Sequence, residues 1–220
     1  GRELYKTNGQ VGGTQLVHDF APGPSSSNFG EMVVVGGRLF LAASDPSGGS
    51  ELWSTGGTSA TTKREFDLYP GGIGSTPKWL TAVGNKLYFI ADMPGVGREL
   101  FVLDTTLAAP PVLIDIFPGS HSSDARGLIA HPSGVGVLLE ANGDFSIGAE
   151  IWTSDGTPAG TSLLVDINPG PGDGHFRGAV TLAGGVLFSA TSNVLGNEPY
   201  FTDGTAIGTV ALADIAPGPG

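Results

Sequence analysis

Short apolar runs separated by turn residues recur along the whole chain. In the stretch 74–121 they cover 79–83, 86–91 and 99–103, and the stretch 63–68 shows what the last run of such a set looks like. Runs of about five residues, broken by Gly-Asn or Pro-Gly pairs, predict β-strands joined by tight turns. Four such strands and their short connections fill about 48 residues and leave no segment for a helix. The pattern therefore predicts an all-β protein.

The polarity of the runs predicts their order in a sheet. The second run, for example 87–91, is almost continuously apolar, which is typical of a strand covered on both faces. The fourth run tolerates charges at 63–65 and begins with Pro110 and Pro111 in another copy. Because proline lacks an N–H and is confined to strand starts and sheet edges, we expect the second strand inside each sheet and the fourth at its outer edge.

Two sequence markers repeat with the same period. One is a glutamate followed two residues later by an aromatic residue, and the other is an aspartate three residues before Pro-Gly. Both recur at spacings of 48, 48, 51 and 48 residues. The glutamates are Glu3, Glu51, Glu99, Glu150 and Glu198, and the aspartates are Asp19, Asp67, Asp115, Asp166 and Asp214. A shared period indicates one repeated structural unit, and the longer spacing predicts one loop enlarged by three residues between Asp115 and Glu150.

Repeated four-stranded units of this length are typical of the blades of a β-propeller. The period predicts four full blades, at 26–73, 74–121, 122–172 and 173–220, in one repeat domain. Residues 1–25 hold only the last two strands of another blade, so we expect an N-terminal half blade and a segment of a longer array. A five-bladed ring with a defective seam, or a blade edge completed by a neighbouring molecule, is the alternative.

The repeated carboxylates are predicted to be structural. An active site needs only one set of catalytic groups. A carboxylate that occurs at the equivalent position of every repeat instead suits a contact made in every blade, such as one that accepts otherwise unpaired backbone N–H groups. A glutamate and the aromatic residue two positions later lie on the same face of a strand. We expect the aromatic ring to pack between blades.

Composition and charge exclude several function classes. The chain carries 10 Lys and Arg against 21 Asp and Glu, a formal net charge of -11, which would repel a nucleic acid. There is no cysteine, which excludes disulfides and thiolate metal sites. The apolar stretches are shorter than the ~20 residues that span a bilayer. Glycine and proline are numerous (37 and 16), but 40% hydrophobic and only 14% charged residues indicate a folded, turn-rich chain.

Residues 51–58 (ELWSTGGT) and 150–157 (EIWTSDGT), the latter followed by VDINPG at 165–170, resemble the ELWxxDGT repeat of large bacterial proteins. The resemblance covers essentially the whole chain. The sequence departs from the pattern in the third copy, where Asp104, Thr105 and Thr106 replace Asp-Gly-Thr. The resemblance implies a propeller-like, exported or surface-located bacterial repeat protein whose repeat has no defined activity.

No catalytic or metal-binding group is evident in the sequence. The four histidines, at 18, 121, 131 and 175, stand at non-equivalent positions, and none belongs to a motif with metal spacing. The Asp-Gly-Thr triplets at 155–157 and 203–205 predict hairpin turns. Calcium is the alternative there, although the spaced acidic oxygens of an EF-hand are missing. We expect no enzyme activity, no cofactor and no metal ion.

The loops that join one blade to the next are the candidate binding surface, since their sequences vary and they emerge on one face. Short polar side chains stand there beside aromatic and basic residues, a combination that suits sugar hydroxyls and ring faces. The alternative is that Ser, Asn, Asp and Gly merely form turns. The candidate residues are Asn28, Phe29, Thr76, Lys78, Trp79, Asp124, Arg126, His175, Phe176 and Arg177.

Together these features favour a non-catalytic, extracellular binding or adhesion module, with several similar sites that act through avidity. The expected partners are glycans or another surface protein. The alternative function is a building block of a surface array or filament, which self-associates through the edge of the incomplete blade.

Overall fold

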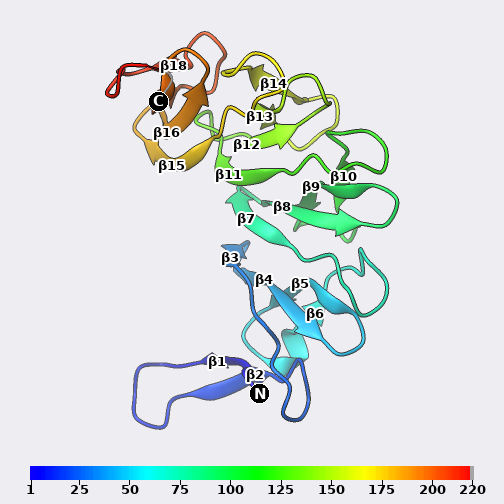
Figure 1. Cartoon of the computed structure of the whole chain (residues 1–220). Coiled ribbons are helices and arrows are strands. Elements are labelled where there is room, and N and C mark those ends of the chain that lie inside the picture. Colours follow the sequence, from blue (N-terminus) through cyan, green and yellow to red (C-terminus); the bar gives the residue numbers. More distant parts are fainter. Residues whose placement is uncertain (219–220) are drawn as a thin grey trace.

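The computed structural model describes residues 1–218, which form antiparallel β-sheets (Figure 1). A two-stranded N-terminal hairpin is followed by four sheets of four strands, here called sheets I to IV. The hairpin pairs β1 (Leu4–Lys6) with β2 (Gln15–His18). Sheet I consists of β3 (Met32–Val35), β4 (Arg38–Asp45), β5 (Gly49–Thr55) and β6 (Lys63–Arg64), and sheet II of β7 (Lys78–Val83), β8 (Lys86–Met93), β9 (Gly97–Asp104) and β10 (Val112–Ile114). Sheet III consists of β11 (Arg126–Ala130), β12 (Val137–Asn142), β13 (Ala149–Ser154) and β14 (Thr161–Val165), and sheet IV of β15 (Arg177–Leu182), β16 (Gly185–Ser192), β17 (Gly196–Thr202) and β18 (Val210–Ala211).

The prediction of an all-β chain with four-stranded antiparallel sheets is confirmed. Strands follow chain order in each sheet, so the second and third are interior and the first and fourth are edges. Strand β6 is shorter than the predicted 63–68, because the chain leaves the sheet after Arg64 and packs Phe66 and Leu68 against the core between sheets I and II. Within residues 1–218 the only helical element is a 3-10 turn at Ser59–Thr61, and no helix is long and apolar enough to cross a membrane.

The sheets lie inside the predicted repeat boundaries, but the three-residue insertion is not in one loop. The hairpin lies within 1–25 and sheets I to IV within 26–73, 74–121, 122–172 and 173–220, whose last two residues, 219 and 220, lie outside the described part. Arg126 pairs with Glu140, 14 residues on, where Lys78 pairs with Ile90, 12 residues on. Glu140 in turn pairs with a residue 11 positions later, and Ile90 with one 10 positions later. The insertion is therefore divided between the β11–β12 and β12–β13 connections.

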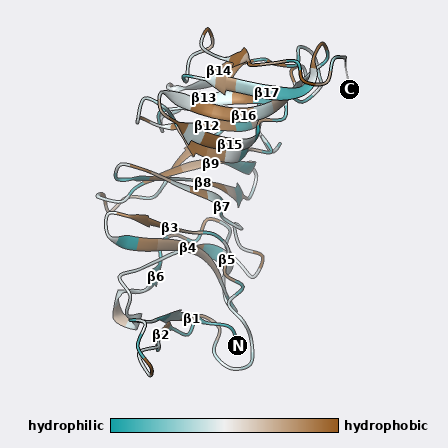
Figure 2. Cartoon of the chain, turned by 90° about the vertical axis from the view of Figure 1, so that its left-hand side faces the viewer, coloured by the Kyte–Doolittle hydropathy of each residue, from teal (hydrophilic) through white to brown (hydrophobic). Residues whose placement is uncertain are grey.

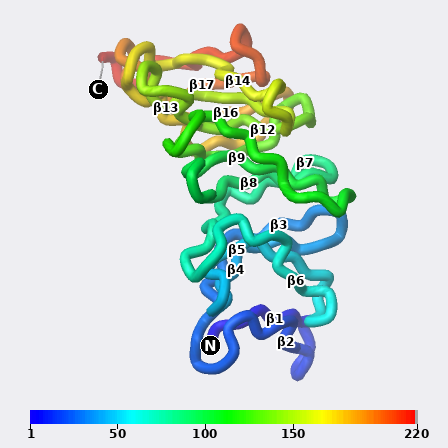
Figure 3. The backbone as a smooth tube through the Cα atoms, turned by 90° about the vertical axis from the view of Figure 1, so that its right-hand side faces the viewer, coloured from blue at the N-terminus to red at the C-terminus, as the bar shows by residue number. Residues whose placement is uncertain are grey.

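The sheets follow one another along an open arc (Figures 1 and 3). The first strand of each sheet (β3, β7, β11 and β15) lies on the inner side of this arc, and the fourth lies on its outer side (Figure 1). Inner strands of consecutive sheets touch, with β7 against β3 and β11, and β11 against β15. A ligand on the inner side can therefore contact residues from two or three sheets.

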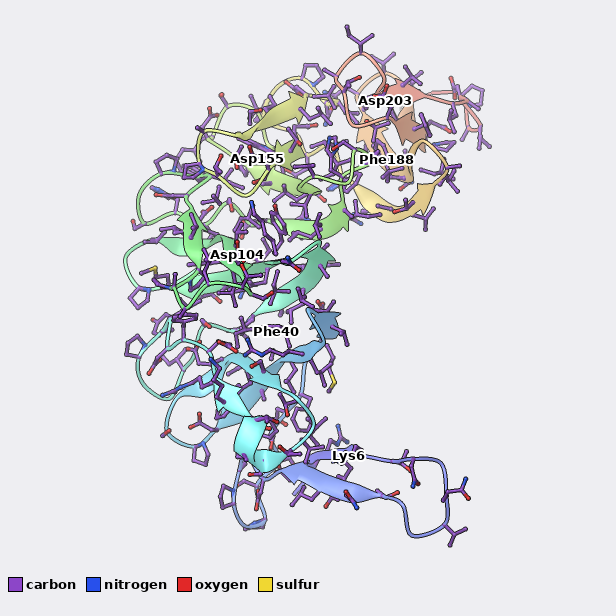
Figure 4. The ribbon with its side chains drawn as sticks, turned by 180° about the vertical axis from the view of Figure 1, so that it is seen from behind. Lys6, Phe40, Asp104, Asp155, Phe188 and Asp203 are labelled. Atoms are coloured by element: carbon purple, nitrogen blue, oxygen red, sulfur yellow. The ribbon has the colours of Figure 1, made fainter. Side chains whose placement is uncertain are left out.

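The core consists of the interfaces between consecutive sheets, and Figure 2 shows hydrophobic stretches along the strands of the stacked sheets. Phe40 of sheet I packs with Leu87 and Phe89 of sheet II, and Leu138 of sheet III packs with Phe188 of sheet IV. Figure 4 shows Phe40 and Phe188 inside their sheets. Each sheet contacts only its chain neighbours in this way, as in other repeat proteins.

The repeated glutamates connect the third strand to the segments that follow the sheet. Each accepts the backbone N–H of the residue 17 positions later, for example Ile116 at 2.9 Å for Glu99 and Ile167 at 2.8 Å for Glu150. Glu99 also accepts the N–H of Ser123 at 2.7 Å, in the loop that leads to the next sheet. The other three such bonds run from Phe20 to Glu3, from Leu68 to Glu51 and from Ile215 to Glu198. These bonds are of the kind that a structural role requires.

The repeated aspartates differ from the glutamates. Those at 19, 67, 115 and 214 are exposed and the one at 166 is half-buried. In the described residues no hydrogen bond is formed by these side chains, and Asp67 alone takes part in an ion pair, with Arg64 at 3.4 Å. The expectation that both sets of carboxylates accept backbone N–H groups therefore holds for the glutamates only. Each aspartate immediately precedes the residue that donates its N–H to the glutamate.

The aromatic residues that follow the glutamates pack between sheets wherever a preceding sheet exists. Trp53 meets Phe20 of the hairpin at a ring distance of 4.9 Å, and Trp152 packs against the core between sheets II and III. Phe101 and Tyr200 are buried in the cores shared with sheets I and III. Tyr5 is the exception, being 56% exposed.

Asp-Gly-Thr forms self-contained turns between the third and fourth strands. The Oδ1 atom of Asp155 accepts both the N–H and the hydroxyl of Thr157, at 2.8 and 2.7 Å, and Asp203 makes the same two bonds to Thr205. These hydroxyl bonds lower the pKa of both aspartates. Asp104, Asp155 and Asp203 occupy equivalent turns of sheets II, III and IV (Figure 4).

Candidate functional site

Two adjoining clefts lie where the inner strands begin. The first cleft, of about 570 Å³, is lined by residues that precede or begin β3, β7 and β11. The second cleft, of about 980 Å³, lies between sheets III and IV and reaches the start of β7. Trp79 and Arg126 line both. Volumes of this order accommodate small-molecule and oligosaccharide ligands.

The loops leading into the inner strands share one unusual backbone conformation. Asn28, Thr76, Asp124 and His175 stand at equivalent positions and have φ values of 42°, 50°, 50° and 54°. Residues other than glycine rarely adopt this left-handed conformation, although Asn and Asp tolerate it best. The repeated conformation places a polar residue at the same position of each loop, where it lines one of the two clefts.

Trp79 occupies a backbone position where the next two copies have glycine. Its φ is 58°, and the equivalent Gly127 and Gly178 have φ values of 68° and 61°. The pairing of β7 with β8 shifts register between Lys78 and Thr81, so Trp79 lies in a β-bulge. A left-handed tryptophan costs about 1–2 kcal/mol relative to glycine. The bulge leaves the indole 41% exposed at the border of both clefts.

The second cleft contains a buried charged residue. Glu140 has no exposed side-chain surface, and its partner across the sheet is Arg126, whose guanidinium forms an ion pair with Oε1. The other carboxylate oxygen, Oε2, is buried and accepts no hydrogen bond in the described residues. The register-equivalent positions in the other sheets hold Ala42, Ile90 and Ser189.

Asp173 and His175 complete the polar wall of this cleft. The Oδ1 atom of Asp173 accepts the N–H of Ala149 at 2.9 Å, and its Oδ2 atom lies 3.9 Å from the Arg126 guanidinium. The Nδ1 atom of His175 lies 3.9 Å from Glu140 Oε1 and 3.3 Å from a guanidinium nitrogen of Arg177. Glu140, Asp173 and His175 are close enough together to hold a metal ion. The Arg126 guanidinium, however, already supplies positive charge between the two carboxylates.

The first cleft is held by contacts between sheets. Glu31, which stands at the position equivalent to Trp79, accepts the N–H of Leu80 at 2.9 Å and so ties sheet I to sheet II. Arg98 is ion-paired with Asp92 and lines the cleft beside Lys78. Charges of both signs therefore alternate along the wall.

The structure brings most of the predicted site residues together. Asn28, Thr76, Lys78, Trp79, Asp124 and Arg126 line the first cleft, and Trp79, Arg126, His175, Phe176 and Arg177 line the second.

Phe29 is a correction to the predicted site, because its ring packs in the core, whereas Phe176 lines the second cleft but is almost completely buried. Phe29 lines neither cleft and packs edge-to-face on Phe20 at 5.5 Å. Phe176 is only 2% exposed and contacts Phe188 at 4.8 Å. Only Trp79 among the predicted aromatic residues offers a ring to a ligand, so the clefts are not several similar sites.

Glu140 and Asp173 were not among the site residues predicted from the sequence. The signal for Glu140 was a single charge in the otherwise apolar run 137–141. Asp173 was inconspicuous because it stands in a loop rich in turn residues.

No protein-family model matches the chain, and no curated protein sequence matches it. Among solved structures it is similar to a puromycin-hydrolysing peptidase of Mycobacterium tuberculosis, with a TM-score of 0.60 and 13% identity over 94% of this chain and 31% of that one. It is also similar to a putative TolB of Agrobacterium tumefaciens, with a TM-score of 0.53 and 12% identity over 81% of this chain and 61% of that one. TolB of Acinetobacter baumannii is similar with a TM-score of 0.53 and 12% identity, over 82% of this chain and 42% of that one. The chain thus spans between 31% and 61% of these proteins, and the likeness shows a propeller-like fold.

Proposed function

We propose that this chain is a non-catalytic binding module whose inner clefts take glycans. The observation that carries the proposal is the exposed indole of Trp79, held in a left-handed bulge where the two following sheets have glycine. Strained residues gather at functional sites, and an exposed indole between polar groups is suited to stacking on a sugar ring.

The electrostatics of the clefts support an uncharged ligand. Lys78, Arg98, Arg126 and Arg177, four of the 10 basic residues of the chain, line the clefts. They face four carboxylates, Glu31, Asp124, Glu140 and Asp173. The whole chain carries a formal net charge of -11, so the equal numbers of basic and acidic residues in the clefts set this surface apart from the rest of the molecule. These residues offer both hydrogen-bond donors and acceptors to hydroxyl groups.

The same ion pairs argue against hydrolysis. Glycoside hydrolysis needs one carboxyl group that donates a proton to the leaving oxygen. Arg126 contacts both Glu140 and Asp173 in the second cleft, and a carboxylate paired with a guanidinium serves as an acceptor. Binding without turnover is therefore the function that these groups support best.

A panel of immobilised polysaccharides tests the proposal. Wild-type protein is expected to be retained by at least one neutral polysaccharide, and Trp79→Ala is expected to lose that retention. Tyr5→Ala is the matched control, since Tyr5 is also an exposed aromatic residue but lies on the hairpin, away from both clefts. Equal retention of wild type and Trp79→Ala would overturn the proposal.

We further propose that sheets I to IV are four blades and the hairpin a half blade of an exported bacterial repeat array. The ELWxxDGT-like segments and the period support this assignment, as does the open arc. The test is to locate the protein by cell fractionation of its native source. Recovery from the cytosol alone contradicts export.

Assembly through the half blade is the second candidate function. Within residues 1–218, β1 pairs with β2 alone, so one edge of β1 is free. Glu3 Oε1 is buried there without a hydrogen-bond partner. Free strand edges pair readily with other strands. Sedimentation velocity should then show particles that grow with protein concentration, and a constant monomer contradicts this candidate.

A further inference from the structure

We propose that Glu140 is the residue that sets ligand specificity in the second cleft, and that this cleft selects uncharged sugars over acidic ones. The inference rests on the proposed glycan-binding function and goes beyond it by naming the ligand class and the discriminating residue. Two observations carry it, the unused carboxylate oxygen of Glu140 and the departure of this position from the repeat.

The unused oxygen is a vacant hydrogen-bond acceptor at the cleft. Glu140 lines the second cleft, its side chain is fully buried, and Oε2 has no partner in the described residues. A buried polar atom without a partner is costly and rare. A ligand hydroxyl that donates to Oε2 removes this cost, so binding energy becomes available only when the ligand offers a donor.

The repeat gives an internal comparison for this residue. Three of the four equivalent positions hold Ala42, Ile90 and Ser189, so the sheet does not need a carboxylate there. Lys78 and Arg177 stand opposite Ile90 and Ser189 without an acidic partner on that strand. A buried charge introduced into one copy only is a mark of ligand recognition, whereas the repeated glutamates serve every copy.

The arrangement of donors and acceptors defines the ligand. Arg126 supplies N–H donors beside the free oxygen of Glu140. A sugar hydroxyl can accept a hydrogen bond from the Arg126 guanidinium and donate one to Glu140 Oε2. Asp173 Oδ2 also lies near Arg126, 3.9 Å from its guanidinium. A sugar carboxylate placed here would face both Glu140 and Asp173, and like charges at close range are unfavourable. The cleft therefore discriminates against uronic acids.

The test compares matched tetrasaccharides that differ only by oxidation of C6. Mannotetraose and cellotetraose are titrated into the full chain by calorimetry, beside the mannuronate and glucuronate tetramers of the same linkage. Wild type is expected to bind at least one neutral tetramer at least tenfold more tightly than its uronate counterpart. Glu140→Gln, which replaces an acceptor by an amide donor, is expected to weaken binding of the neutral tetramer about tenfold or more and to reduce the preference for it.

Two further variants keep the test decisive. Glu140→Ser installs the residue that sheet IV carries at this position, and it replaces Glu140→Gln if that protein does not fold. Asp203→Asn is the control, since Asp203 lies in a turn outside the clefts and asparagine preserves its hydroxyl contact. A wild-type preference for uronates, or neutral-sugar affinity within threefold of wild type in both Glu140 variants, overturns the inference and leaves glycan binding intact. Failure of wild type to bind any tetramer overturns both.

Discussion

Arg126 and Glu140 are direct partners across β11 and β12, and their side chains form an ion pair inside the second cleft. In sheets II and IV the same pairing joins Lys78 to Ile90 and Arg177 to Ser189. The basic residue is therefore shared by sheets II, III and IV, whereas the acidic one occurs in sheet III alone. The clefts combine such repeated residues with Trp79 and Glu140, which depart from the repeat.

The backbone at Trp79 predicts a measurable difference between two substitutions. Trp79→Gly relieves the left-handed strain and Trp79→Ala retains it, so the glycine variant should be more stable than the alanine variant by about 1 kcal/mol. Denaturant unfolding gives the two free energies. Both variants should lose sugar binding to the same extent, because both lack the indole. An alanine variant as stable as the glycine variant would show that the backbone there is not strained.

Removing a repeated glutamate is expected to destabilise the fold. Glu99→Ala leaves the N–H groups of Ile116 and Ser123 without their acceptor, which should lower the free energy of unfolding by about 3 kcal/mol or more. Asp115→Ala, one residue before the first donor, removes an exposed side chain and should change stability by about 0.5 kcal/mol or less. Chemical denaturation measures both, and equal effects would contradict the structural role given to the glutamates.

The buried glutamates make stability depend on pH near neutrality. Burial raises the pKa of Glu99 and of Glu150 to about 7, from 4.5. A carboxyl group with a raised pKa binds more protons in the folded state, so its favourable contribution is complete below pH 4.5 and is lost as the pH rises through 7. The free energy of unfolding should fall by about 3 kcal/mol for each group between pH 5 and pH 8.

Substitution isolates this effect. Glu150→Gln cannot ionise and should remove the part of the pH dependence between pH 5 and pH 8 that Glu150 contributes, while the part from Glu99 remains. The aspartates whose pKa is lowered, Asp155 and Asp203 among them, act only at more acidic pH and do not interfere. A double variant at Glu99 and Glu150 with the full wild-type slope would refute this origin of the pH dependence.

Tyr88 links sheet II to sheet III through a single hydroxyl group. Its oxygen donates to the carbonyl of Asp155 at 3.0 Å, and burial together with the Asp155 charge raises the pKa of Tyr88 to about 12. Tyr88→Phe should therefore cost about 1 kcal/mol. Tyr5→Phe, on an exposed residue, should cost nothing measurable. Thermal unfolding compares the stability of the two variants. A Tyr88→Phe variant as stable as the wild type would show that this bond does not stabilise the contact between the sheets.

The fold was predictable because every copy repeats the same physical solution. The glutamate and aromatic markers follow one period, and apolar runs bounded by glycine and proline indicate strands in any single copy. The insertion was misplaced because sequence spacing alone cannot divide three residues between two connections. The insertion is located only by comparing two strand pairings, that of Arg126 with Glu140 and that of Lys78 with Ile90.

The site was predictable in part, and for a different reason. Loop position brought Lys78, Trp79 and Arg126 together correctly, since equivalent loops converge at the start of the inner strands. Phe29 and Phe176 were wrong as ligand-facing rings because proximity in sequence does not say which side of the backbone a ring takes. Glu140 lies on a strand, so no examination of the loops could have found it.

The indole N–H signals of the three tryptophans show which of these residues contacts a bound sugar. Within residues 1–218, Trp53 and Trp152 have buried indole nitrogens without hydrogen-bond partners, while Trp79 is 41% exposed at both clefts. Titration of a ¹⁵N-labelled chain with the neutral tetrasaccharide that binds should move one indole signal, the one that is missing in Trp79→Ala. Movement of the Trp53 or Trp152 signal instead, or a sugar complex that leaves the Trp79 signal unchanged, would contradict the account.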